Sequence, residues 1–264
     1  MEQSDLFRVS MIQSHIVRED INENINNFKD LFCRLKGETD LVVLPELFTT
    51  GLTTRTELAE QNDGKTISEI KKYAADYNFA LTGSYMASDN GKYFNRAFFI
   101  TPDGKEYFYD KRHLFSFAGE DKCFSSGAER LVLDYQGWKI CLMICYDLRF
   151  PVWSRNVDNE YDLLIYVANW PEVRRKAWKA LLRARAIENM CYTCGVNRVG
   201  TDEDGNKYHG GSSIFSPKGK RIFKVKKNEV SAVTGTIDKE KLESFREKFP
   251  VWKDADRFEI NDLI

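Results

Sequence analysis

The sequence predicts a single-domain α/β protein in which helices pack on the faces of β-sheets. Segments typical of strands and helices alternate along all 264 residues, and such mixtures are stable when helices cover sheet faces. The chain has only 16 glycines and 6 prolines, and we find no linker rich in proline, glycine or serine and no internal repeat. With 42% hydrophobic residues it can bury a sizeable core. We therefore expect one domain over residues 1–264.

The first part of the chain predicts strands and helices in alternation. Residues 6–12 form an expected strand, and Asp20 then opens a helix whose apolar residues recur every three or four positions. Residues 41–44 are a short, fully apolar run, typical of a strand buried on both faces. Thr66 and Glu69 predict a capping box at the start of the next helix.

The remainder predicts mostly strands around one long helix. That helix is expected from Glu172 to Met190, with Val173 and Ile187 at the two ends of its inward stripe, and a last helix is expected near Asp238. The expected strands are residues 79–86, 93–100, 105–109, 131–135, 139–144, 163–168, 192–199, 210–216, 221–225 and 230–236.

Charge and hydropathy exclude several partner classes. Lysine and arginine number 39 against 40 acidic residues, without blocks of one sign, so neither a nucleic-acid nor a membrane partner is expected. The longest apolar run, residues 140–146, is far shorter than the roughly 18 to 20 residues of a membrane span. The start, MEQSD, lacks the pattern of an export signal. We therefore expect a cytoplasmic protein whose six cysteines are free thiols.

Three polar residues stand directly after apolar runs, where α/β proteins place working groups. Glu46 follows the run at 41–44, and apolar walls there would favour its use as a general base. Lys111 lies in a charged cluster between two aromatic stretches. Cys145 ends an apolar run at a turn into a helix, where backbone N–H groups favour a thiolate. Taken alone, each residue has a simpler interpretation. Glu46 could cap a helix, Lys111 could lie in a solvated turn, and Cys145 could be a core residue.

Together the three residues describe an acyl-transfer site. A thiolate would attack, a carboxylate would carry protons, and an ammonium group would hold the developing negative charge. Glu46 and Lys111 are 65 positions apart in the sequence, and Lys111 and Cys145 are 34 apart. Only the fold can bring them together.

The residues around these three positions resemble the motifs of the nitrilase superfamily of carbon–nitrogen hydrolases. The motifs are LPELFTTG at 44–51, YDKRHLF at 109–115 and ICYDLRFP at 144–151, followed by ANWP at 168–171, RARAIEN at 183–189, NRVG at 197–200 and GGSS at 210–213. The resemblance covers nearly the whole chain. It implies an α-β-β-α sandwich that dimerises into a four-layer stack, and hence a homodimer, with no cofactor and no metal.

The resemblance also implies roles for residues. Cys145 would be the nucleophile and Glu46 the general base and acid. Lys111 would stabilise the tetrahedral oxyanion with the backbone N–H of Tyr146. Glu120 falls where the family has a second glutamate, which would orient Lys111 or the substrate. The product of the first step would be ammonia and a thioester on Cys145.

Within the superfamily, the motifs most resemble the ω-amidase branch, which implies 2-oxoglutaramate and 2-oxosuccinamate as substrates. Such anions need an arginine clamp, and we expect Arg174 to supply it beside Asn169 and Trp170. Arg112 and Arg175 are further candidates, each of which could equally be a structural ion pair. Arg149 is expected to be a structural partner within the cysteine motif.

Other functions stay open from the sequence. Another aliphatic amidase, a carbamoylase or a nitrilase would share the same three residues, and a catalytically silent scaffold would be expected to have lost one of them. A papain-like protease would need a histidine partner for its cysteine and usually an export signal. The chain has only three histidines and no export-signal pattern at its start, which argues against this class. The pair Cys191 and Cys194 invites a redox or zinc interpretation, which we reject because no second cysteine or histidine pair completes a metal site.

Overall fold

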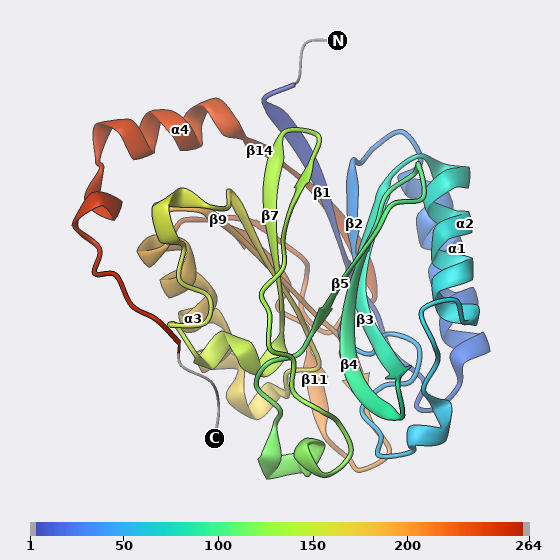
Figure 1. The fold of residues 1–264 in the computed structure, drawn as a ribbon. Helices are drawn as coiled ribbons and strands as arrows, with labels where there is room; N and C mark the ends of the chain where they lie inside the picture. Colours follow the sequence, from blue (N-terminus) through green and yellow to red (C-terminus); the bar gives the residue numbers. More distant parts are fainter. Residues whose placement is uncertain (1–3, 261–264) are drawn as a thin grey trace.

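A computed structural model describes residues 4–260 as two six-stranded sheets packed face to face, with helices on both outer faces (Figure 1). The first sheet has the order β14 (Ser231–Asp238), β1 (Leu6–Gln13), β2 (Leu41–Val43), β3 (Ala80–Asp89), β4 (Lys92–Ile100) and β5 (Glu106–Asp110). The second has the order β13 (Arg221–Lys224), β12 (Ser213–Phe215), β9 (Tyr192–Asn197), β8 (Leu163–Ala168), β7 (Trp138–Ile144) and β6 (Val132–Tyr135). Helices α1 (Ile21–Leu35) and α2 (Lys65–Tyr77) cover the first sheet, and α3 (Arg175–Glu188) and α4 (Lys239–Lys248) lie beyond the second. The predicted α-β-β-α sandwich is confirmed.

Both sheets have parallel strands at their centres. Strands β1, β2 and β3 are parallel to one another, and so are β7, β8 and β9, whereas the outer strands pair antiparallel. Two antiparallel steps from β3 through β4 also bring β5 into the direction of β2. Polar residues that follow strands of one direction collect at one edge of a sheet. This topology positions the site described below.

Alternation along β1 divides the apolar residues between two cores. Phe7, Val9 and Met11 face the second sheet, whereas Ile12 joins the core beneath α1 and α2. Helix α1 buries the apolar face that its spacing predicted, with Phe28 and Phe32 fully inside. Each such aromatic side chain contributes about 1.5–3 kcal/mol by burial.

Two sequence predictions about helices were wrong. Helix α2 has Gly64 as its N-cap, and Thr66 lies inside the first turn, where Glu60 accepts hydrogen bonds from its backbone N–H (3.1 Å) and its hydroxyl. A carboxylate from outside the helix thus replaces the expected capping box.

The second wrong prediction concerns the helix expected at 172–190. The chain forms a short 3₁₀ turn, η6 (Glu172–Arg174), before α3, and both Val173 and Ile187 are exposed. The buried face instead carries Trp178, Leu182, Arg185 and Ala186. The buried face also accommodates Arg185, whose Nη2 donates to the carbonyl oxygen of Leu148 at 2.6 Å.

A two-stranded hairpin was missed by the sequence analysis. Strands β10 (Val199–Thr201) and β11 (Lys207–His209) pair antiparallel outside the two large sheets. The strand expected at 210–216 is correspondingly shorter. No helix in residues 4–260 is long and apolar enough to cross a bilayer. The export-signal prediction rests in part on residues 1–3, which lie outside the described range.

Helix α4 is anchored to the second sheet by a buried ion pair. Arg246 Nη1 lies 2.8 Å from Asp162 Oδ1, and its Nε and Nη2 donate to the carbonyl oxygens of Met190 (3.0 Å) and Tyr161 (2.7 Å). Both charged side chains are more than nine-tenths buried.

We expect Arg246→Met to lower the free energy of unfolding by about 3–5 kcal/mol, because it leaves Asp162 and two carbonyl groups buried without this partner. Lys241→Met is the control, since Lys241 pairs with Asp238 at 2.7 Å but its side chain is 80% exposed, and it should change stability little. Urea denaturation measures both variants. Equal stability of the two would contradict the role of this buried pair.

Candidate active site

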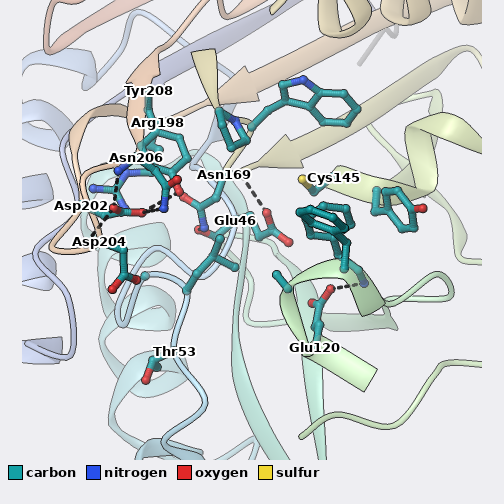
Figure 2. Close-up of a pocket in the computed structure, with 18 of the residues that line it drawn as sticks. Glu46, Thr53, Glu120, Cys145, Asn169, Arg198, Asp202, Asp204, Asn206 and Tyr208 are labelled. Atoms are coloured by element: carbon teal, nitrogen blue, oxygen red, sulfur yellow. Dashed lines mark hydrogen bonds between the residues drawn. The ribbon is translucent and has the colours of Figure 1, made fainter. Parts of the chain in front are cut away.

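The residues predicted from the ends of separate strands meet in one cavity of about 400 Å³ (Figure 2). Glu46 follows β2, Lys111 follows β5 and Cys145 follows β7, and all three line this cavity with Glu120. Glu46 and Lys111 are each only 1% exposed. Because water is largely excluded from them, charges here interact more strongly than on the surface.

Cys145 sits on a strained turn. It is the first residue of the 3₁₀ turn η4 (Cys145–Arg149), and its φ of 41° lies in the left-handed region that non-glycine residues rarely adopt. Such strain persists where the surroundings hold it, and it is common at functional sites.

Asp147 holds this turn. Its Oδ2 accepts hydrogen bonds from the Ile144 N–H (3.0 Å) and the Tyr109 hydroxyl (2.8 Å). Its Oδ1 accepts from the backbone N–H of His113 at 2.9 Å, and the His113 ring nitrogen Nδ1 lies at the same distance. Tyr109 and His113 flank Lys111 by two residues on either side, so this buried carboxylate ties the Cys145 turn to the Lys111 segment.

The Lys111 ammonium group lies between two carboxylates. Its Nζ is 2.9 Å from Glu46 Oε1 and 2.9 and 2.8 Å from the two oxygens of Glu120. Glu120 is placed by the left-handed Gly119 (φ 76°) before it and by a hydrogen bond from the Phe115 N–H at 2.6 Å. Burial alone would lower the pKa of Lys111, but the charges of Glu120 and Glu46 outweigh it and raise that pKa, so the lysine stays protonated.

Burial decides the resting state of the Cys145 thiol. Burial raises the pKa of the Cys145 thiol well above its usual value, and the charge of Glu46 acts in the same direction. Lys111 lowers it, as expected, but by less. Cys145 therefore rests as a neutral thiol beside an ion pair, and its proton must leave as the sulfur attacks.

Asn169 and Trp170 follow β8 and line the cavity. The Asn169 backbone N–H donates to Glu46 Oε2 at 2.7 Å, and its Nδ2 donates to the Glu46 carbonyl oxygen at 2.9 Å. Trp170 is buried, and its indole N–H donates to the Arg174 carbonyl oxygen at 2.9 Å. Asn169 thus orients the carboxylate of Glu46, and Trp170 fixes the backbone at Arg174.

The three candidate arginines separate into two groups. Arg174 lines the cavity with its guanidinium 5.3 Å from the Phe115 ring centre. Arg112 is buried, donates to the Gly127 carbonyl oxygen at 2.9 Å and stacks over an indole ring, which is a structural role. Arg175 is exposed and does not line the cavity.

Arg149 differs from its predicted structural role. It is exposed, lines the cavity and lies 5.0 Å from the Trp170 ring centre. Within residues 4–260, neither Arg149 nor Arg174 has a carboxylate at ion-pair distance, so both positive charges are available to an anion.

The hairpin that the sequence analysis missed forms another part of the cavity wall. Figure 2 shows Arg198, Asp202, Asn206 and Tyr208 gathered away from Cys145. Asp202 Oδ2 accepts hydrogen bonds from the Tyr208 hydroxyl (2.9 Å) and the Asn206 amide (3.0 Å). Arg198 lies in the NRVG motif, whereas the sequence signals Asp202 and Asn206 only through the turn-forming segment at 202–206.

The redox interpretation of Cys191 and Cys194 finds no support in their environment. Both side chains are buried in the second sheet. Burial raises the pKa of Cys191 to about 12 and that of Cys194 also well above its usual value. Unlike Cys145, neither thiol lines the cavity, so neither is placed to react with a substrate there.

Comparisons with known proteins agree with this geometry. The family model described as carbon-nitrogen hydrolase matches residues 8–247. The chain is 38% identical to omega-amidase YafV of Escherichia coli (strain K12) over 96% of this chain and 98% of that protein. It is 34% identical to 2-oxoglutaramate amidase of Bacillus subtilis (strain 168), over 93% and 96% of the two chains.

Among solved structures, the fold matches XC1258 from Xanthomonas campestris, a CN-hydrolase superfamily protein whose crystal structure carries an arsenic adduct in the active site. The TM-score is 0.95 and the identity 39%, with 97% of this chain and 99% of that chain covered. The family match spans most of the chain, and the relatives align along nearly their full length. The chain belongs to the carbon-nitrogen hydrolase family, within the nitrilase superfamily.

Proposed function

We propose that this protein is an ω-amidase that hydrolyses the terminal amide of 2-oxoglutaramate and 2-oxosuccinamate to the dicarboxylate and ammonia. The observation that carries the proposal is one cavity that holds a thiol, a carboxylate and an ammonium group beside Arg149 and Arg174, which make no ion pair within residues 4–260. Omega-amidase YafV and 2-oxoglutaramate amidase, which align over more than nine-tenths of this chain, support the same substrate class.

Acylation begins with the neutral thiol. As Cys145 Sγ attacks the amide carbonyl carbon, its proton passes to Glu46, and the carbonyl oxygen becomes an oxyanion. Lys111 Nζ and the backbone N–H of Tyr146 stabilise that oxyanion. The C–N bond then breaks, Glu46 returns its proton to the nitrogen, and ammonia leaves a thioester on Cys145.

The contacts of Lys111 suggest how it serves both states. At rest, its ammonium group is shared between Glu46 and the two oxygens of Glu120. Once Glu46 takes up the thiol proton, it loses its charge and becomes a weaker acceptor. The N–H that pointed to Glu46 is then free to turn to the oxyanion, while Glu120 keeps the ammonium group in place.

Deacylation repeats the chemistry with water. Glu46, now ionised, removes a proton from a water molecule that attacks the thioester carbon. The C–S bond breaks, the acid product leaves, and Cys145 regains its proton from Glu46. General acid and base catalysis of this kind contributes on the order of 10² to 10⁴ in rate.

Arg174 is proposed to bind the substrate carboxylate. We expect Arg174→Ala to raise KM for 2-oxoglutaramate roughly 10- to 100-fold with a smaller effect on kcat, because a charge-assisted pair to the substrate is lost. Arg175→Ala is the matched control, since Arg175 is the next residue but is exposed outside the cavity lining, and its kinetics should stay near wild type. An unchanged KM in Arg174→Ala would remove this residue from the clamp.

A panel of substrates tests the proposed activity against other members of the superfamily. Ammonia release is measured from 2-oxoglutaramate, 2-oxosuccinamate, an N-carbamoyl amino acid and a simple nitrile. The proposal expects turnover of the two keto acid amides. Turnover of only the carbamoyl compound or the nitrile would contradict it, and turnover of none would favour a catalytically silent protein.

We further propose that the protein works as a cytoplasmic homodimer, as the family resemblance implies. Light scattering on the purified protein measures its mass in solution. A monomer at all concentrations would contradict the dimer. Fractionation of cells that produce the protein tests the compartment.

A further inference from the structure

A buried amide on β4 touches three of the proposed catalytic residues. Asn95 is 0% exposed and precedes the apolar residues 97–100 of its strand. Its Nδ2 donates to Glu46 Oε1 at 2.8 Å and to Glu120 Oε1 at 3.1 Å. The backbone carbonyl oxygen of Asn95 accepts a hydrogen bond from the backbone N–H of Lys111 at 3.0 Å.

The orientation of this amide is fixed from behind by β3. The Ser84 hydroxyl donates to Asn95 Oδ1 at 2.9 Å, and it accepts the backbone N–H of Leu47, the residue after Glu46, at 2.8 Å. With its oxygen committed to Ser84, the Asn95 side chain presents only N–H groups to the two carboxylates. One chain of hydrogen bonds thus runs from the backbone beside Glu46, through Ser84 and Asn95, to the carboxylate of Glu46 itself.

The two oxygens that Asn95 binds are also the oxygens that face Lys111. Glu46 Oε1 and Glu120 Oε1 each lie 2.9 Å from Lys111 Nζ. Two carboxylates that approach one ammonium group repel each other, and an N–H donor shared between them offsets part of that repulsion. Asn95 therefore supplies a neutral donor between Glu46 and Glu120, on the oxygens that also contact Lys111.

We infer that Asn95 is a positioning residue that holds Glu46 and Glu120 ionised and aimed at Lys111, and so prepares Glu46 to accept the Cys145 proton. This inference rests on the proposed role of Glu46 as the general base. The motifs around the three catalytic positions do not include this residue.

The inference has a consequence for pH dependence. The titratable groups that face Glu46 in the described structure are Lys111, Glu120 and Cys145. Loss of the Asn95 donors removes a contact that favours the ionised carboxylates. Because the base must be ionised to act, the acid limb of the kcat/KM profile should move to higher pH.

Asn95→Leu tests this, since leucine has nearly the shape of asparagine and removes the N–H donors without adding a charge beside the two carboxylates. The measurement is the pH profile of kcat and KM, with whichever amide the wild-type enzyme hydrolyses. We expect a kcat about 10- to 100-fold lower at neutral pH, a KM that changes much less, and an acid limb shifted to higher pH. Ser84→Ala frees the amide to rotate and should shift the limb in the same direction by less.

Asn156→Ala is the control for a merely structural effect. Asn156 is also a buried amide, and its Nδ2 donates to two carbonyl oxygens, those of Tyr161 (2.9 Å) and Asn189 (3.0 Å), away from the cavity. It should lower the melting temperature and leave the acid limb in place. An acid limb that stays in place in both Asn95→Leu and Ser84→Ala would overturn the inference. Loss of activity in Cys145→Ala in the same assay would still support the proposed function, even where the Asn95 inference fails.

Discussion

Cys145→Ala is expected to abolish amide hydrolysis, with kcat reduced by a factor on the order of 10⁴ or more. The reason is that no other group in the cavity can carry the acyl intermediate in the position that Lys111 and Glu46 serve. Cys145→Ser should also be nearly inactive, because a hydroxyl proton is harder to remove than a thiol proton. Ammonia release with enzyme in excess measures both variants.

The cavity offers a matched control for that experiment. Cys123 is a second, partly buried thiol in the lining of the same cavity, and Cys123→Ala should keep most of the activity. Wild-type rates in Cys145→Ala, or loss of activity confined to Cys123→Ala, would contradict the assignment of the nucleophile.

Lys111→Met is expected to have the second-largest effect, on both catalysis and stability. Losing an oxyanion donor costs about 10²- to 10³-fold in kcat. It also leaves Glu46 and Glu120 buried without their cation, which we expect to cost about 3–5 kcal/mol of unfolding free energy at neutral pH. Activity assays and urea denaturation measure the two effects.

The raised pKa of Lys111 determines how its contribution to the free energy of unfolding changes with pH. A folded-state pKa above the unfolded value means that the lysine contributes its full stability below about pH 10 and loses it only above. The deficit of Lys111→Met should therefore be present in full across the neutral range. A deficit that grows as the pH falls would contradict this account.

A double variant separates charge from shape. Lys111→Met with Glu120→Gln removes one of the two stranded charges, so it should recover part of the lost stability while remaining inactive. If it recovered none, the destabilisation of Lys111→Met would come from packing and not from the carboxylate pair.

Much of the site could be predicted because it depends on local sequence. Glu46, Lys111 and Cys145 each stand where an apolar strand ends, and each lies in a motif that resembles one family. The α-β-β-α sandwich followed from the alternation of strands and helices together with that resemblance. Parallel strand directions then brought together three residues that are far apart in the sequence.

What the sequence could not show depends on pairing between distant elements. Asn95 reads as one polar residue in a strand, and its importance arises only because β3 places Ser84 behind it. Arg149 appeared structural until the fold placed it over Trp170 at the cavity. The buried face of α3 was misassigned because a charged Arg185 lies inside it, where it donates to the carbonyl oxygen of Leu148 and pairs with Glu188.

The central claim is that catalysis passes through a thioester on Cys145. The most direct test is the intact mass of the protein after a brief pulse of 2-oxoglutaramate quenched in acid. The account expects an increase equal to the substrate less ammonia, located on the peptide that contains Cys145. An adduct on another residue, or a chain that stays unmodified at every quench time while ammonia is released, would contradict it.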